Sequence, residues 1–513
     1  MTKSSSLIDA FNAAAENYAG SQCVIESDKS YTFEEIKKAS DKFAVGLISQ
    51  GIEKADRVAL YCINSVEFAI AYMGIVKLGA VVVPINLLQK AAEVTYIMND
   101  AEVKALIYHE AFQANVEEIL PALTTPILSV QIGLEENKSS DWQQLFDNDG
   151  SLTAITIDAD IDLVAILYTS GTTGKPKGAM LTHKNLVTNT ASVFKAMKWQ
   201  AGKEIVSLVL PMFHAFAATV GMLTPLTHGC SFVPIAKFEP DKLLNTIKQT
   251  NSSIFLGVPS MYNVLLNIKD HKINNFSSIK LCISGGASMP VDVMNRFEKK
   301  FGVAIYEGDG PTECSPVTCV NPVGGVRKIG TVGLPVPNVE MKIVDESGNE
   351  MARGEIGEIA VRGDSVMKGY WKQPEATAQS FIDDWFLTGD LGNEDEEGYF
   401  SILDRKKDMV IVNGMNVYPR IIEEVLYRFE AVLEAAVIGH ADELHGEIPV
   451  AYIVLKDTFE ADSADIRRWC RKHLGNYEVP RKVVFMDALP KNGAGKIVKR
   501  VLNKQGEVER GVQ

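Results

Sequence analysis

A chain of 513 residues is too long for one ordinary hydrophobic core, so its length predicts two or more domains. Hydrophobic residues make up 46% of the sequence and charged residues 23%, which is typical of a soluble globular protein. The formal net charge of −14 argues against a general nucleic-acid-binding protein, because such a protein presents a basic surface to phosphates.

Cysteine usage and apolar stretches indicate a cytoplasmic protein without a membrane span. The seven cysteines are scattered and form no Cys-x-x-Cys pair, which favours free thiols in a reducing compartment. The N-terminus carries Asp9 and Glu16 and has no long apolar core, so it does not resemble a secretory signal. The most apolar stretch, residues 68–85, is interrupted by Lys77 and Gly79, and we expect a helix followed by a strand.

The first third of the chain alternates between helices and strands. Thr32 to Glu35 forms a capping box, which predicts a helix that begins there and ends near Gly51. Further on we expect strands at 58–61, 80–83, 105–108 and 163–167, and helices at 66–78 and 92–99. The strands are continuously apolar, which is typical of a parallel sheet covered on both faces.

The same alternation continues, and several strands lead into polar, glycine-rich loops. We expect a helix at 185–197 and strands at 205–210, 254–258, 280–283 and 303–306. In open α/β sheets the ligand crevice lies beyond the carboxyl ends of the strands. The loops that follow these strands can therefore share one site.

The pattern changes near residue 330 and again near residue 404. Short strands at 338–344, 357–361 and 398–402 predict a smaller β subdomain. A dense charge run, Asp404 to Asp408, precedes a compact α+β unit with strands at 409–412, 435–438, 450–455 and 482–485 and helices at 423–429 and 464–474. The predicted fold is α/β: a large N-terminal domain of doubly wound sheets with a β subdomain, residues 1–403, and a small C-terminal domain, residues 404–513.

The segment from Tyr168 to Gly178 follows a buried strand and has the composition of a phosphate-binding loop. Its glycines let backbone N–H groups approach an anion, its hydroxyls add donors, and Lys175 and Lys177 add positive charge. The spacing differs from that of a Walker loop. A mobile glycine-rich linker is the alternative interpretation.

Four further side chains are candidates for nucleotide chemistry, each with a plain structural alternative. Glu313, next to Thr312, could hold Mg²⁺, or it could be the first-turn acid of a helix. Asp390 follows an aromatic-rich strand and suits the hydroxyls of a ribose, whereas a solvated turn aspartate is the alternative. Arg405 could give a second ribose or phosphate contact, or it could be a surface arginine. The glycines on either side of Lys496 let its loop insert elsewhere, whereas a solvated surface lysine is the alternative.

Five motifs occur together in an order typical of one superfamily. They are Tyr168–Gly178, Tyr306–Glu313, Thr388–Asp390, Asp404–Asp408 and Asn492–Lys496. On these motifs the chain resembles the acyl-activating, AMP-forming synthetases, which include acyl-CoA synthetases, firefly luciferase and the adenylation domains of peptide synthetases. The resemblance covers nearly the whole chain and is greatest to the bacterial long-chain fatty acid–CoA ligases.

The resemblance implies a two-step reaction. A carboxylate attacks the α-phosphorus of ATP to give acyl-AMP and pyrophosphate, and the thiol of coenzyme A then displaces AMP. It implies that Lys496 bridges the two anions, that Glu313 and Thr169 hold Mg²⁺, and that the phosphates, adenine, ribose and coenzyme A contact a larger set of residues. These are Thr169, Ser170, Gly171, Thr172, Thr173, Gly174 and Lys175 for the phosphates, Gly285, Gly286, Ala287, Gly308, Asp309, Gly310 and Thr312 for adenine, Asp390 and Arg405 for ribose, and Gly414 for the pantetheine arm.

The resemblance also implies that the C-terminal domain is mobile. In the family this domain rotates about the residue that matches Asp404, which removes the lysine that matches Lys496 and brings the turn at 412–414 to the site. The charge run at 404–408 therefore has a hinge interpretation beside that of a solvated linker.

The acid substrate is predicted from residues that are absent as well as present. Residues 211–216 contain no aspartate to hold an α-ammonium group, and no carrier segment follows before Gln513, so coenzyme A is the expected thiol acceptor. His214 could gate the acyl entrance or be a satisfied buried histidine. Residues 215–222 are small or apolar and suit an alkyl chain, although a core helix is an equal alternative. Residues 306–313 offer no cation for a second carboxylate.

We therefore expect a medium- or long-chain fatty acid, ATP and coenzyme A as small-molecule partners. An aryl acid is the alternative substrate, and a nucleotide-binding regulator that has lost turnover is the alternative function. The oligomeric state, including a homodimer, stays open.

Overall fold

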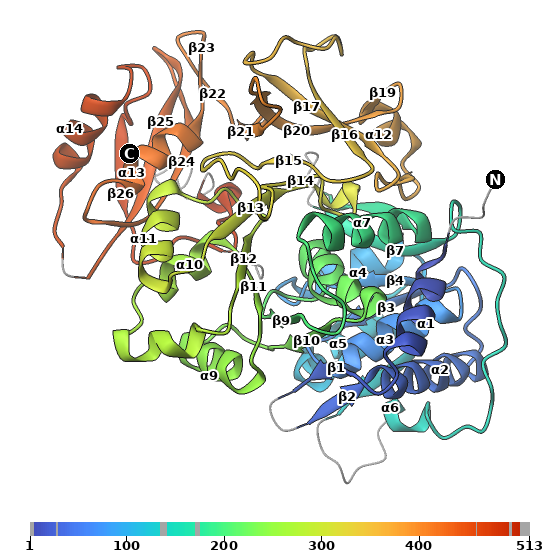
Figure 1. The fold of residues 1–513 in the computed structure, drawn as a ribbon. Helices are drawn as coiled ribbons and strands as arrows, with labels where there is room; N and C mark the ends of the chain where they lie inside the picture. The colour runs from blue at the N-terminus through green and yellow to red at the C-terminus, as the bar shows by residue number, and fades with distance from the viewer. Residues whose placement is uncertain are drawn as a thin grey trace.

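The computed structural model describes residues 5–26, 29–133, 141–169, 175–457, 459–491 and 495–502. Its described strands form four sheets, two large and two small (Figure 1). The large sheets carry helices on their faces and belong to the N-terminal part of the chain, whereas the last sheet lies in a separate C-terminal part. The predicted α/β fold with a smaller C-terminal domain is confirmed.

The nine-stranded sheet has the order β15-β14-β13-β12-β11-β9-β10-β1-β2. Its six strands from β13 to β1 are parallel to their neighbours, and β2, β14 and β15 extend the two edges in antiparallel orientation. The strands are β1 (Gln22–Ile25), β2 (Ser30–Thr32), β9 (Ile205–Leu208), β10 (Ser231–Pro234), β11 (Ile254–Gly257), β12 (Leu281–Ser284), β13 (Ile305–Asp309), β14 (Cys319–Val320) and β15 (Leu334–Pro335). Every residue of β11 and β12 is buried, which explains their continuous apolar pattern.

The seven-stranded sheet has the order β18-β8-β7-β4-β3-β5-β6. Strands β7, β4, β3, β5 and β6 are parallel, and β8 and β18 continue the sheet in antiparallel orientation. The strands are β3 (Arg57–Tyr61), β4 (Val81–Pro84), β5 (Val103–His109), β6 (Leu128–Ile132), β7 (Leu163–Thr169), β8 (Lys177–Thr182) and β18 (Gly369–Tyr370). The sequence analysis did not predict β8, whose first residues fell within the predicted phosphate loop.

Helices cover the large sheets and share a core with them. In α3 (Val66–Lys77) every residue except Glu67 is buried, so this helix is covered on all sides. Lys77 ends α3 with its ammonium bonded to Ser40 and Asp41 of α2. The other helices of this part are α1 (Leu7–Asn17), α2 (Phe33–Ser49), α4 (Ala91–Asp100), α5 (Gln113–Ile119), α6 (Asp141–Gln144), α7 (His183–Ala196), α8 (Thr224–His228), α9 (Pro240–Thr250), α10 (Pro259–Leu265) and α11 (Val291–Phe301).

Most sequence-predicted elements of these layers are found. The capping box at Thr32 and Glu35 is present, and α2 begins there as predicted. A seven-residue π-helix, η3 (Ala217–Leu223), lies in the apolar stretch for which a core helix was the alternative interpretation, and all its residues are buried. Among the described residues, no helix is both long and apolar enough to cross a membrane.

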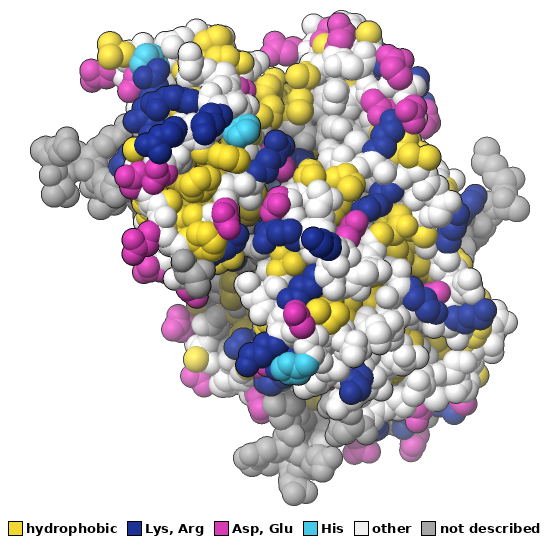
Figure 2. Space-filling model, turned by 60° about the vertical axis from the view of Figure 1, so that its left-hand side comes forward, with side chains coloured by type: hydrophobic (Ala, Val, Ile, Leu, Met, Phe, Trp, Pro, Cys, Tyr) yellow, Lys and Arg dark blue, Asp and Glu magenta, His cyan; other side chains and the backbone are white. Residues whose placement is uncertain are grey.

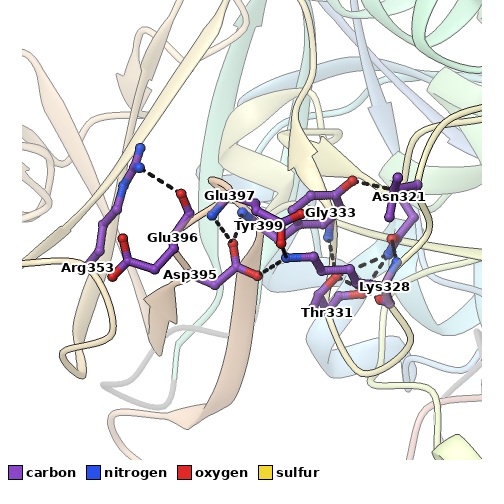
Figure 3. Close-up of polar contacts among 10 residues, drawn as sticks. Asn321, Lys328, Thr331, Gly333, Arg353, Asp395, Glu396, Glu397 and Tyr399 are labelled. Atoms are coloured by element: carbon purple, nitrogen blue, oxygen red, sulfur yellow. Dashed lines mark hydrogen bonds and ion pairs between the residues drawn. The ribbon is translucent and has the colours of Figure 1, made fainter.

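The β subdomain is an antiparallel sheet whose last hairpin is fixed to the nine-stranded sheet. Its order is β16-β17-β20-β19, with β21 beside β20. Lys328 donates to Asp395 at 2.5 Å and lies 4.4 Å from the ring centroid of Tyr399, in the turn between β20 and β21 (Figure 3). The elements are β16 (Val339–Val344), β17 (Gly357–Gly363), β19 (Phe381–Ile382), β20 (Trp385–Glu394), β21 (Phe400–Arg405) and α12 (Pro374–Gln379).

The C-terminal part, residues 410–502 as far as they are described, has its own sheet and core. The sheet order is β23-β22-β25-β24, with β26 beside β25, and the helices pack against it. The elements are β22 (Val410–Val412), β23 (Met415–Val417), α13 (Pro419–Tyr427), β24 (Val432–Asp442), β25 (Gly446–Leu455), α14 (Ser463–His473) and β26 (Lys482–Phe485). Strand β21 runs through residue 404 to Arg405, so the domain boundary at 404 stays a prediction.

The surface mixes charges of both signs despite the net charge of −14. Figure 2 shows a dense group of Lys and Arg side chains at the upper left, with Asp and Glu side chains near it. Positive side chains therefore gather locally on an acidic protein.

Candidate active site

A pocket opens where β9, β12 and β13 of the nine-stranded sheet end. It has about 520 Å³ of free space, its open mouth included, and it is bounded by the loops that follow these three strands. Its lining residues are Val193, Met197, His214, Phe216, Val220, Ile283, Ser284, Gly285, Gly286, Gly308, Asp309, Gly310, Thr312, Pro316, Val317 and Val320. Six of the seven predicted adenine contacts are among them, and Ala287 is not.

The backbone at Gly286 is open to the pocket. Gly286 has a φ of +76°, and a Cβ atom there would meet nothing closer than 4.0 Å. At the neighbouring Gly285, an added Cβ atom would lie 3.3 Å from the Phe216 ring. Gly286 therefore leaves room for a planar ring to approach the main chain, whereas the Phe216 ring occupies that direction at Gly285.

Asp390 and Arg405 face each other across two antiparallel strands. They are paired in register between β20 and β21, and Nε of Arg405 lies 2.7 Å from Oδ1 of Asp390. Asp390 is only 5% exposed and lies inside β20. Residues 388–390 continue the alternation of buried and half-buried residues along β20. The prediction that Asp390 follows the strand is therefore wrong, and so is the alternative of a solvated turn aspartate.

Two carboxylates and two cations share this end of the pocket. Burial raises the pKa of Asp390 to about 7, although Arg405 and Lys496 act in the opposite direction. Burial likewise raises the pKa of Asp309, again against Arg405 and Lys496. Burial would lower the pKa of Arg405, but the carboxylates of Asp390 and Asp309 outweigh it and raise that pKa.

Lys496 reaches the pocket from the C-terminal part. Together with Leu210, Pro211, His214, Phe216, Val258 and Gly286 it lines a second, smaller pocket that shares three of those residues with the first. The preceding residue, Gly495, accepts a hydrogen bond at 3.0 Å from the Ser260 hydroxyl of α10. Burial lowers the pKa of Lys496, and Arg405 lowers it further, while Asp390 and Asp309 raise it.

His214 lines both pockets and stays neutral at physiological pH. Its Nδ1 accepts a hydrogen bond from the Phe216 backbone N–H at 3.3 Å. Burial lowers the pKa of His214 to about 4, and Lys496 adds to that effect. Because Nδ1 accepts, the neutral imidazole carries its proton on Nε2 and can donate a hydrogen bond at the pocket without carrying a charge.

Glu313 sits beside Thr169, as predicted for a magnesium site, with a third residue that the sequence analysis missed. Its Oε1 accepts a hydrogen bond from the Tyr370 hydroxyl at 2.9 Å and lies 3.5 Å from the Thr169 hydroxyl. Glu313 belongs to a short 3₁₀ turn, η5 (Thr312–Cys314), so its first-turn position and its contact with Thr169 coexist. No sequence motif linked Tyr370 to Glu313, which lies 57 positions earlier.

The Glu313 carboxylate and Thr169 hydroxyl oxygens suit a hard cation whose remaining ligands include phosphate oxygens. The described part of the chain holds no group of three or more His, Cys, Asp or Glu side chains arranged for a metal. Mg²⁺ characteristically takes one or two protein carboxylates and completes its shell with phosphate oxygens and water. Glu313 and Thr169 suit that mode.

The predicted phosphate loop lies only partly within the described residues. Ser170, Gly171, Thr172, Thr173 and Gly174 lie outside them. The flanking strands β7 and β8 form an antiparallel hairpin, with Thr169 paired to Lys177. Lys175 lies 5.6 Å from the Tyr96 ring centroid, and Lys177 lies 5.0 Å from that of Tyr370.

Gly414 is not among the residues that line either described pocket. It lies in the exposed turn between β22 and β23 with a φ of +80°. Figure 1 shows these two strands at the top of the C-terminal part. In this arrangement Lys496, and not the turn at Gly414, lines a pocket that shares residues with the predicted nucleotide site.

Comparison with known proteins matches both parts of the chain. The model of the AMP-binding enzymes matches residues 11–371, and that of the AMP-binding enzyme C-terminal domain matches residues 421–496. A long-chain-fatty-acid–CoA ligase of Bacillus subtilis (strain 168) is 36% identical over 502 residues, which cover 92% of this chain and 90% of that protein. The chain therefore belongs to the AMP-binding enzymes, and within them to the AMP-forming acyl-CoA synthetases.

Solved structures of ligases superpose on nearly the whole chain. The anthranilate CoA ligase AuaEII in complex with anthranoyl-AMP gives a TM-score of 0.92 at 28% identity, covering 98% of each chain. ATP-bound MatB from Rhodopseudomonas palustris gives 0.89 at 32% identity, covering 97% of this chain and 98% of that one. Apo MatB gives 0.77 with the same coverage, so the present arrangement is more similar to the ATP-bound form.

Proposed function

We propose that this protein is a fatty acid–CoA ligase that activates a medium- or long-chain fatty acid with ATP and transfers the acyl group to coenzyme A. The observation that carries this proposal is the position of Lys496. This lysine of the C-terminal part lines the smaller pocket beside His214 and Gly286, and the charges of Asp309, Asp390 and Arg405 act on its pKa.

In the first step, a carboxylate oxygen forms a bond to the α-phosphorus of ATP while the bond to the β-phosphate oxygen breaks. Pyrophosphate leaves and acyl-AMP is the product. Two anions meet in this step, so the ammonium of Lys496 stabilises the charge that develops between them. Asp390 and Arg405 hold the ribose, and the loop from Thr169 to Lys175 holds the departing phosphates.

Magnesium at Glu313 and Thr169 supplies neutralisation of the phosphate charge when it is bound. Tyr370 orients the Glu313 carboxylate by donating to it. In the second step, the coenzyme A sulfur forms a bond to the acyl carbon and the bond to the AMP oxygen breaks. We propose that the C-terminal part rotates about residue 404 between the steps, which withdraws Lys496 and presents the turn at Gly414 to the pantetheine arm.

The lining of the pocket supports a monocarboxylic, apolar acid. Its apolar lining includes Val193 of α7, Met197 directly after that helix and Val220 of η3, together with Val317 and Val320. No lysine or arginine is among the described residues that line this pocket. Such a wall suits an alkyl chain and leaves a second carboxylate unpaired.

The relatives give the same preference without deciding it. The ligases of Bacillus subtilis and Salmonella typhimurium, 36% and 34% identical to this chain, carry the name long-chain-fatty-acid–CoA ligase. The solved neighbours include ligases of anthranilate and benzoate, which keeps an aryl acid as the second candidate. All seven cysteines are free and buried, which agrees with the reducing cytoplasm that we propose as the location.

A panel of acids tests the proposal. The purified protein is incubated with ATP, Mg²⁺ and fatty acids of increasing chain length, benzoate, anthranilate or malonate, and pyrophosphate release and acyl-CoA are measured. We expect release and thioester formation with the fatty acids and little with malonate. Aryl acids as the best substrates would overturn the fatty-acid assignment, and no release with any acid would favour a nucleotide-binding regulator.

A further inference from the structure

A buried charged contact joins the first turn of α13 to strand β13, across the boundary between the C-terminal part and the rest of the chain. Nη1 of Arg420 donates to the backbone oxygen of Ile402, and Nη2 lies 4.0 Å from Oε1 of Glu307. The Arg420 side chain is 13% exposed and that of Glu307 is 2% exposed. Both charges are therefore removed from water where the two parts meet.

Glu307 is incompletely satisfied apart from this contact. Its Oε1 accepts a hydrogen bond from the Met289 backbone N–H at 2.9 Å, while Oε2 accepts none from the described residues. Arg420 faces it as a cation, whereas Glu424 and Asp309 face it as anions. A buried carboxylate among other carboxylates is costly unless a cation offsets it, and Arg420 supplies that charge.

The backbone of the same arginine holds the predicted hinge residue. The Arg420 N–H donates to Oδ2 of Asp404 at 2.8 Å, and the Arg405 N–H donates to Oδ1 of Asp404 at 2.8 Å. The main chain of Arg420 thus belongs to the hinge, while its guanidinium reaches residues that precede the hinge. A rotation about residue 404 would separate the guanidinium from Glu307.

Among the described residues from 410 onward, three other hydrogen bonds cross the same boundary. Asn263 donates to the Leu433 oxygen at 2.9 Å, and the Val291 N–H donates to Glu424 at 3.3 Å. The Ser260 hydroxyl donates to Gly495, next to Lys496, as described above. None of these three pairs an arginine or lysine with a carboxylate, so Arg420 and Glu307 contribute a different, charge-dependent stabilisation.

We infer that Arg420 is a positioning residue that, through Glu307 and Ile402, holds the C-terminal part in the arrangement that delivers Lys496 to the pocket. This inference rests on the proposed two-step reaction. Arg420 touches no substrate in this account and acts on the reaction only through the placement of Lys496. Its loss should therefore impair acyl-AMP formation and spare the second step.

The test compares the two half-reactions in Arg420→Met, which keeps the backbone N–H to Asp404. We expect acid-dependent exchange of pyrophosphate into ATP to fall about tenfold, a size typical of couplings between contacting groups. Conversion of supplied acyl-AMP and coenzyme A to acyl-CoA should stay within about twofold. The matched control is Arg428→Met, since Arg428 lies at the end of the same helix and is exposed, and neither half-reaction should change.

Two further variants connect the effect to the ion pair. Arg420→Lys keeps the charge and should recover part of the exchange rate. In a Glu307→Gln background, Arg420→Met should cost no more than about threefold, because the charge it offsets is gone. A full tenfold loss in that background would remove Glu307 as the partner and overturn the inference, as would equal losses in both half-reactions.

The outcome for the wild-type protein separates the inference from the proposed function. If the wild type exchanges pyrophosphate and the Arg420→Met variant does so equally well, the positioning role is wrong and the ligase function stands. The proposed function itself fails if the wild type shows no pyrophosphate exchange with any of the acids and also forms no acyl-CoA from supplied acyl-AMP.

Discussion

Replacing Lys496 by alanine tests the central element of the proposed mechanism. The lysine lines the smaller pocket with His214, which also lines the larger one, and the charges of Asp309, Asp390 and Arg405 act on its pKa. Alanine removes its charge and leaves the C-terminal part otherwise unchanged. The substitution should therefore act on the step in which two anions react.

The expected size follows from the electrostatics of a unit charge near the protein surface. At an effective dielectric constant of about 20, unit charges about 4 Å apart interact with about 4 kcal/mol. Each 1.4 kcal/mol, approximately, corresponds to a factor of about ten in rate, so the loss should be about 1,000-fold. Removal of one donor from an oxyanion-binding site costs about 100- to 1,000-fold in other enzymes, which agrees with that figure.

The assay again separates the half-reactions. Pyrophosphate exchange with a fatty acid should fall about 1,000-fold in Lys496→Ala, and thiolysis of supplied acyl-AMP should be spared. The matched control is Lys491→Ala, because Lys491 lies in the same segment but forms an ion pair with Glu434 at 2.5 Å. Its exchange rate should stay within about twofold of the wild type.

Two results would refute this reasoning. Exchange that falls less than about tenfold would show that Lys496 does not stabilise the developing charge. Equal loss of exchange and thiolysis would show that the lysine is needed in both steps, which contradicts its withdrawal between them.

Three other predictions each concern a single residue. Tyr370→Phe removes the donor to Glu313, so the Mg²⁺ concentration for half-maximal activity should rise about tenfold with little change in the saturated rate; an unchanged requirement would contradict the orienting role. Gly414→Val should slow thiolysis and leave pyrophosphate exchange intact, and slowing of both would place Gly414 outside the coenzyme A path. Burial raises the pKa of Glu307 from 4.5 to about 7, so the stability contributed by its protonated form is lost as the pH rises through this range. Glu307→Gln should therefore gain on the wild type in free energy of unfolding between pH 5 and pH 8, by up to about 3 kcal/mol in denaturant titrations, and a constant difference would contradict the raised pKa.

Local sequence was sufficient where the physical cause is local. The capping box at Thr32 sets the start of α2, because its hydroxyl and the Glu35 carboxylate satisfy each other's backbone N–H groups. The continuous apolar runs of β11 and β12 predicted strands that are covered on both faces. Glycine-rich loops after β12 and β13 predicted the crevice, since parallel strands end at one edge.

Long-range pairing decided what the sequence could not. Asp390 and Arg405 are 15 positions apart, and only the register of β20 and β21 brings them within 2.7 Å. The same holds for Tyr370, which reaches Glu313 because Tyr370 lies in β18, at the edge of the seven-stranded sheet. No local sequence pattern links Asp390 to Arg405 or Tyr370 to Glu313.

By itself the sequence determined the elements, the motifs and the residue types that a carboxylate-activating site requires, because propensity, capping and glycine conformation act over a few residues. Only the tertiary structure decided which of these side chains meet. Burial and charge there depend on segments hundreds of residues apart, as with Lys496 beside His214 and Arg420 beside Glu307. Their energetics arise when the two parts of the chain exclude water from the same crevice.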